Sequence, residues 1–219
     1  MTGNYHAAFA HQFDDPEQQR AAGELGMWVF LATEILFFGG VFAAYTVYRL
    51  ANPDVFAVAS NELDLRLGAT NTLVLICSSF TMATAVYHAH KGNRKWIIVF
   101  LFATVILGLV FLGIKAIEYA QKFEHHLVPG AGFRIEGTDP ARAQIFFSLY
   151  FAMTGLHALH MIIGAGIMIV LIVKAWKGRF SPEYYTPVEL GGLYWHFVDI
   201  IWIFLFPLLY LLGRSAVGH

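Results

Sequence analysis

The chain has 219 residues, of which 58% are hydrophobic and 13% are charged. About a quarter of the residues in soluble domains are charged, so this composition excludes most classes of soluble protein. The formal net charge is -1, from 14 basic and 15 acidic residues, which offers no basic surface. We therefore expect no binding to nucleic acid.

Five long apolar stretches dominate the sequence. A helix that crosses a bilayer needs roughly 20 apolar residues, whereas a barrel strand needs about ten in an alternating pattern, and these stretches are continuous. The predicted fold is therefore all-α, an integral membrane bundle of five transmembrane helices. Its predicted spans are residues 25–48, 67–87, 96–119, 145–173 and 190–212, within a domain of residues 25–213 flanked by tails at residues 1–24 and 214–219.

Polar connections join these spans. A polar loop is predicted between the first two spans, and a longer loop at residues 121–143, where proline and glycine mark turns. Basic residues concentrate in two short connections, KGNRK at residues 91–95 and KAWKGR at residues 174–179. Short basic loops stay on the cytoplasmic side of a membrane, so the N-terminal tail is predicted to be cytoplasmic and the C-terminal tail to lie outside.

Ionisable side chains lie inside the predicted spans, where each needs a partner or a purpose. Glu34 lies well inside the first span. His157 and His160 are three residues apart on the fourth span and therefore share a helix face. His196 and Asp199 repeat this spacing on the fifth span. These positions are the candidate functional residues of the membrane interior.

The paired histidines have two interpretations. Residues three apart on a helix can chelate one metal ion, and either His157 or His160 could hold a haem together with His196 on another helix. A di-iron site in a helical bundle uses Glu-x-x-His on two helices, a pattern that this sequence lacks. We therefore favour hydrogen bonds between helices and expect no metal site.

Glu34 also has two interpretations. Burial in hydrocarbon favours the neutral form of an isolated acid. In that form Glu34 either hydrogen-bonds to a His or Asp of another helix or exchanges protons with the cytoplasmic side. Lys115 and Glu118, near the outer end of the third span, are expected to form a local ion pair from which Lys115 extends toward the membrane interface.

Four segments carry a resemblance to a known family. They are FLATEILFFGG with Glu34, GATNTLVL with Asn71 and Thr72, TGLHALHMIIG, and YWHFVDIIWIFLFPLLY. In this order, each inside a predicted span, they resemble subunit III of the haem-copper respiratory oxidases, the cytochrome c oxidase and bacterial quinol oxidase family. The resemblance covers residues 24–213, in a form with five spans where mitochondrial-type members have seven.

The resemblance implies a non-redox accessory subunit of a proton-pumping terminal oxidase in an aerobic respiratory chain. This chain would hold no cofactor and no catalytic residue, because haem and copper lie in partner subunits and oxygen is reduced to water in subunit I. It would pack against subunits I and II, stabilise subunit I and support proton uptake. Bound phospholipid also fits the family, although the first two helices that complete the lipid cleft of seven-span members are missing here.

The five-span form favours the inner (plasma) membrane of a bacterium, with either quinol or cytochrome c as the electron donor. By its position in the family's segments, the resemblance implies that Glu34 is a buried acid that reacts with carbodiimides. His160, His196 and Asp199 are its candidate hydrogen-bond partners, and His157 joins them in a polar network between helices. Four further histidines are expected to collect protons, because imidazole titrates near neutral pH. They are His6, His11, His88 and His90.

Two rival functions stay open from the sequence. The accessory protein of nitric oxide reductases shares these segments in a similarly short chain. A self-contained membrane metalloenzyme or proton-coupled transporter would instead be built around Glu34, the paired histidines and Asp199. If an oxidase containing this chain joins a larger respiratory supercomplex, we expect the contact at residues 121–143.

Overall fold

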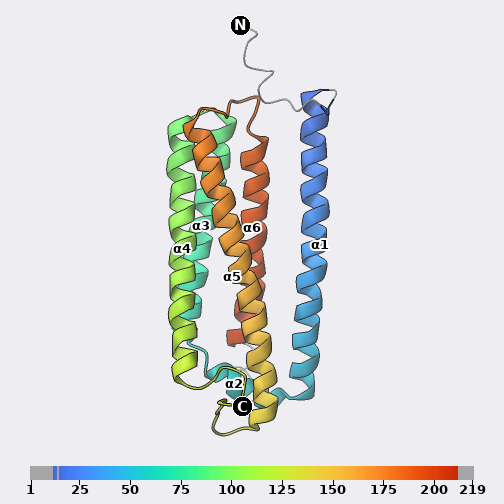
Figure 1. Ribbon diagram of the computed structural model, residues 1–219, viewed down its shortest axis with the longest axis vertical. Coiled ribbons are helices and arrows are strands. Elements are labelled where there is room, and N and C mark those ends of the chain that lie inside the picture. The colour runs from blue at the N-terminus through green and yellow to red at the C-terminus, as the bar shows by residue number, and fades with distance from the viewer. Residues whose placement is uncertain (1–11, 14, 212–219) are drawn as a thin grey trace.

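The computed structural model describes residues 12, 13 and 15–211. Five of its helices are long and apolar enough to cross a membrane, which confirms the predicted all-α transmembrane bundle. These are α1 (Pro16–Ala51), α3 (Leu65–His90), α4 (Arg94–Glu124), α5 (Pro140–Trp176) and α6 (Thr186–Phe206). A short helix α2 (Pro53–Asn61) and a π-helical turn η2 (Pro207–Leu211) complete the described elements (Figure 1).

Aspartate side chains begin three of the long helices. Asp15 accepts a hydrogen bond from the backbone N–H of Gln18 at 2.6 Å, and Asp139 accepts one from Ala141 at 3.0 Å. Asp64 caps α3 in the same way. Each carboxylate satisfies an N–H that has no partner within its own helix. With these caps, α1 and α5 begin several residues before the predicted apolar spans, and α3 begins directly at Leu65.

The long helices therefore extend beyond the hydrocarbon. With a rise of 1.5 Å per residue, the 36 residues of α1 span about 54 Å, whereas the hydrocarbon core of a bilayer is about 30 Å thick. The connection between α4 and α5 is correspondingly shorter than the predicted loop, because α4 continues to Glu124 and α5 begins at Pro140. The C-terminal end of α4 and the N-terminal end of α5 thus lie outside the predicted apolar spans.

The connection between α1 and α3 is not a simple polar loop as predicted, since it contains α2. Pro53 occupies the first turn of α2, where its missing N–H costs nothing. Phe56 and Ala59 bury one face of α2 against the bundle, and Phe56 packs edge-on against Tyr45 and Phe146. The helix α2 closes the end of the bundle near η2 (Figure 1).

Helix α6 is the centre of the bundle, and α1 is its least embedded member. Helices α3, α4 and α5 pack in sequence, and α6 packs against α1, α3 and α5. In the apolar stretch of α6, 56% of the residues are buried, against 11% in α1. Figure 1 shows α1 standing to one side of the other long helices. Most of the surface of α1 is thus not covered by the other helices of this chain.

Trp195 of α6 shows how closely the central helix is enclosed. Its ring lies against Gly108 of α4 and Gly164 of α5, where a Cβ atom would come within 2.8 Å and 3.0 Å of the indole. Its Nε1 donates to Ser78 Oγ of α3 at 2.9 Å. Small residues on two helices and one hydroxyl on a third therefore fix the depth and rotation of α6.

Candidate functional site

Glu34 and His160 lie together between α1 and α5. The Glu34 Oε2 atom is 3.1 Å from His160 Nε2, and the two side chains are 20% and 13% exposed. Phe38, one turn beyond Glu34, packs edge-on against the His160 ring. Of the three candidate partners of Glu34, the structure thus places His160 beside it.

His160 has a second contact that decides which ring nitrogen meets Glu34. Its Nδ1 lies 2.8 Å from the backbone carbonyl of Leu156, and a carbonyl only accepts, so Nδ1 is the donor there. Nε2 is therefore the nitrogen that faces the carboxyl group of Glu34.

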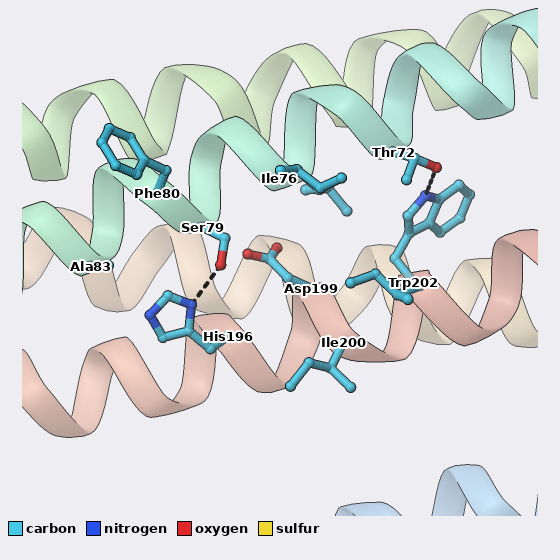
Figure 2. A pocket seen from close by; sticks show the side chains of 11 residues that line it. Thr72, Ile76, Ser79, Phe80, Ala83, His196, Asp199, Ile200 and Trp202 are labelled. Atoms are coloured by element: carbon cyan, nitrogen blue, oxygen red, sulfur yellow. Dashed lines mark hydrogen bonds between the residues drawn. The ribbon is translucent and has the colours of Figure 1, made fainter.

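His196 and Asp199 lie in a different place, in a groove between α3 and α6 (Figure 2). His196 Nδ1 is 2.7 Å from the Oγ atom of Ser79. Asp199 is 3% exposed, and neither of its carboxyl oxygens has a hydrogen-bond partner among the described residues, although Ser79 lies beside it. The structure therefore pairs His196 with α3 and does not bring either residue to Glu34.

His157 lies in the core, one turn before His160 but on the buried side of α5. Its ring centroid is 5.3 Å from those of Phe111 and Trp202. Neither ring nitrogen has a hydrogen-bond partner within the described part of the chain, and the same holds for the side-chain amide of Asn71. The four residues predicted as one network between helices thus lie in three separate surroundings.

A fourth polar cluster is fully buried around Glu118. Its carboxylate accepts from Lys115 Nζ at 2.8 Å, from the Tyr150 hydroxyl at 3.0 Å and from the Tyr210 hydroxyl at 2.5 Å. Lys115 also donates to Tyr210 and lies 4.7 Å from the centroid of Trp202. The predicted ion pair is confirmed, but the expectation that Lys115 extends to the interface is wrong, because Lys115 is 4% exposed.

Tyr150 and Tyr210 also belong to this cluster, although no sequence pattern predicts them there. They come from α5 and η2, and both hydroxyls donate to the carboxylate of Glu118. These hydrogen bonds use lone pairs of Glu118 that the ion pair with Lys115 leaves without a donor. The period of the apolar pattern reveals only which residues share a helix. Contacts between residues 118 and 210 depend on helix packing, for which the sequence carries no local signal.

The predicted proton-collecting histidines fall in two parts of the chain. His6 and His11 lie outside the described residues. His90 Nε2 is 2.9 Å from Glu189 of α6, which also lies 3.5 Å from Arg20 of α1. His88 stacks on the rings of Trp96 and Phe100. His90 thus belongs to an ion-pair cluster that joins α1, α3 and α6 at one end of the bundle.

Metal ligation has no candidate among residues 12, 13 and 15–211. Among the described residues, no three His, Cys, Asp or Glu side chains are grouped so that they could hold a metal ion. His157 and His160 point into different surroundings, the first among aromatic rings and the second toward Glu34. The spacing of three residues on α5 therefore serves two separate contacts.

Comparison with known proteins identifies the family. A sequence model of the family described as cytochrome c oxidase subunit III matches residues 15–214. The cytochrome c oxidase subunit 3 of Thermostichus vulcanus is 36% identical over 195 residues, which cover 87% of each chain. The cytochrome bo(3) ubiquinol oxidase subunit 3 of Pseudomonas aeruginosa is 32% identical over 215 residues, 96% of each chain.

The quinol oxidase subunit 3 of Bacillus subtilis is similar over almost the whole chain, with 31% identity over 216 residues, 97% of this chain and 99% of that protein. The matches confirm the family resemblance carried by the four segments, and they span all five transmembrane helices. The chain belongs to the cytochrome c oxidase subunit III family and is an accessory, multi-pass membrane subunit of a haem-copper oxidase complex.

Proposed function

We propose that this chain stabilises the catalytic subunit I of a proton-pumping oxidase, next to subunit II, and supports proton uptake without a redox centre of its own. One observation carries the proposal: the polar side chains of the membrane interior mostly bond between the helices of this chain. Glu34 meets His160, Trp195 meets Ser78, and Glu118 meets two tyrosines. Such contacts make a rigid bundle suited to support a neighbouring subunit.

The proposed location is the plasma membrane of a bacterium, with the N-terminal end of α1 in the cytoplasm. The connections after α3 and after α5 lie at the same end of the bundle, since Arg94 donates to the carbonyl of Trp176 and Gly92 lies against Pro182. Both connections are basic, as the cytoplasmic side requires. Haem, copper and the electron-donor site then belong to partner subunits, and phospholipid is a proposed ligand of the exposed helix faces.

Copurification tests this function. A tagged form of the chain, extracted from its native membrane in mild detergent, is expected to bring with it a subunit that contains haem and copper. The chain separated from that complex is expected to hold neither metal. A tagged chain that purifies without any haem protein, or that keeps one equivalent of iron on its own, contradicts the proposal.

Within this function, we assign Glu34 as the carbodiimide-reactive acid. Carbodiimides attack carboxyl groups, and the side chain of Glu34 is 20% exposed beside His160, within the apolar span of α1. Glu34→Gln is expected to abolish labelling of this chain in the intact complex, while the amide preserves a hydrogen bond to His160 Nε2. Glu124→Gln is the control, because Glu124 is an exposed acid at the end of α4 and its removal leaves no buried charge unpaired. Labelling that survives Glu34→Gln contradicts the assignment.

The proposed collection of protons by His6, His11, His88 and His90 has its own test. Replacing all four with Gln removes the imidazole groups while keeping polar side chains. Turnover of the complex is expected to slow mainly at higher pH, where protons are scarce. An unchanged dependence of turnover on pH would show that these histidines do not serve proton uptake.

A further inference from the structure

A groove of about 450 Å³ runs between α3 and α6 on the outside of the bundle (Figure 2). Its rim is apolar and open to the surroundings, since Ile76, Phe80 and Ile203 are 51%, 71% and 49% exposed. Its lining includes the polar side chains of Thr72, Ser79 and His196, and the carboxyl group of Asp199 lies between Ser79 and Ile76. The groove therefore combines an apolar opening with a buried acid.

Asp199 lacks the contacts that a buried acid requires. Its side chain is almost entirely enclosed, and neither oxygen has a hydrogen-bond partner among residues 15–211. Thr72 is engaged elsewhere, since it donates to the Gly68 carbonyl and accepts from Trp202. Ser79 also contacts His196, and its hydroxyl carries a single proton, so at least one carboxyl oxygen of Asp199 has no donor among the described residues. A polar group buried without a partner is unfavourable, so the site favours binding of a donor from outside this chain.

The depth of Asp199 limits which molecule can supply this donor. With a rise of 1.5 Å per residue, Asp199 lies about 20 Å from the start of α6 at Thr186, and Leu211 lies about 18 Å beyond it. This position is near the middle of a hydrocarbon core of about 30 Å. Acyl chains have no hydrogen-bond donor, and lipid head groups lie at the interfaces. A polypeptide side chain can reach this depth within a transmembrane helix.

The floor of the groove favours the close approach of a helix. Thr72, Ser79 and Ala83 line it, at spacings of seven and four residues that place them on one face of α3. Small residues at such spacing allow two helix backbones to come together in membranes, and polar side chains then bond across the contact. The bulkier Phe80 and Ile203 at the rim would pack on either side of the incoming helix.

We propose that the groove between α3 and α6 docks one transmembrane helix of another subunit of the oxidase, which places a hydrogen-bond donor on Asp199. The donor is a side chain such as Ser, Thr, Asn, Gln or a basic residue. The existence of the partner rests on the proposed function, whereas the place of contact rests on the groove and on Asp199.

Site-specific crosslinking in the intact complex tests the place of contact. A benzophenone amino acid replaces Ile203 at the rim of the groove or, as the matched control, Ile169 of α5, which is similarly exposed at 52%. Position 203 is expected to crosslink to a helix of another subunit, identified by mass spectrometry of the joined peptides, with at least about fivefold more product than position 169. Adducts at position 203 with lipid or quinone alone, or with no molecule, overturn the proposal.

Variants of Asp199 test the hydrogen bond. Asp199→Asn retains a polar partner and is expected to keep the chain in the complex. Asp199→Leu removes the buried polar group, so the bundle itself still folds, but retention in the complex during a detergent titration is expected to fall about fivefold. Equal retention of both variants contradicts the role of Asp199. A complex that never forms, even with the unaltered chain, contradicts the proposed function instead.

Discussion

Among single residues, Lys115 shows why a charged side chain is tolerated in the bundle core. Its ammonium group meets a carboxylate, a hydroxyl and the faces of aromatic rings, so each of its donors has a partner. A buried ion pair with such contacts adds little net stability compared with apolar residues of the same size, but the loss of one member leaves the other charge unpaired.

Removal of Lys115 is therefore expected to cost more than removal of both charges. Lys115→Met should lower the free energy of unfolding by about 3–5 kcal/mol, because the carboxylate of Glu118 stays buried without its counter-ion. The double variant Lys115→Met with Glu118→Gln should recover most of this loss, since a neutral amide still accepts from the tyrosines. Denaturing titrations of the purified chain in mixed micelles measure both values; a double variant as unstable as the single one contradicts the ion-pair account.

The sequence predicted the polar residues of the interior but not their partners. Glu34, His160 and Asp199 are recognisable because ionisable groups in apolar spans need contacts. Which of the candidates meets Glu34 depends on how α1 is rotated against α5, and no local pattern encodes this rotation. Lys115 was misjudged for the same reason, because Tyr210, 95 residues away, supplies its contact in the core.

For the helices, prediction succeeded at the apolar centres and failed at the ends. The five spans follow from continuous apolar sequence, but the helices extend into polar residues once Asp15 and Asp139 cap them. Helix α2 was missed because its nine residues bury only one face, which is too short a pattern to separate from a polar loop. Capping hydrogen bonds thus determine where a helix begins, which hydropathy alone does not reveal.

The close contact between Trp195 of α6 and Gly108 of α4 gives a prediction for helix packing. Gly108→Ala is expected to destabilise the bundle by about 1–3 kcal/mol, because the added methyl group would lie 2.8 Å from the indole and displace α6 from α4. Gly113→Ala is the matched control on the same helix, since no atom lies within 4 Å of its added methyl group. Unfolding titrations should show a loss for the first variant and no loss, or a small gain, for the second.

At the scale of the whole molecule, the spans could be located from the sequence, but not their arrangement. Every span is apolar, so hydropathy does not reveal that α6 is central and α1 peripheral. A weak signal exists in the polar content of α6, which includes His196 and Asp199, because a helix surrounded by protein tolerates such residues better than one facing lipid. The positions of the helices relative to one another depend on contacts between helices, which hydropathy does not encode.

The predicted orientation can be tested with cysteine labelling, since Cys77 is the chain's single cysteine. On a Cys77→Ser background, Lys177→Cys lies in the basic connection before α6, and Glu136→Cys lies in the connection before α5; both positions are exposed. A maleimide that cannot cross membranes is expected to label position 136 in intact cells and position 177 only in inverted vesicles. The reverse pattern would place the N-terminal end outside.

The central position of α6 has a consequence for the biogenesis of the chain. Helix α6 follows α3, α4 and α5 in the sequence, yet it packs among them and covers His157 and Ser78, while η2 directly after it covers Glu118. While α6 is still being synthesised, these groups stand open in the nascent bundle. Insertion of α6 is thus the step that buries these polar groups. An insertase or chaperone that recognises exposed polar groups in an incomplete bundle would act before this step.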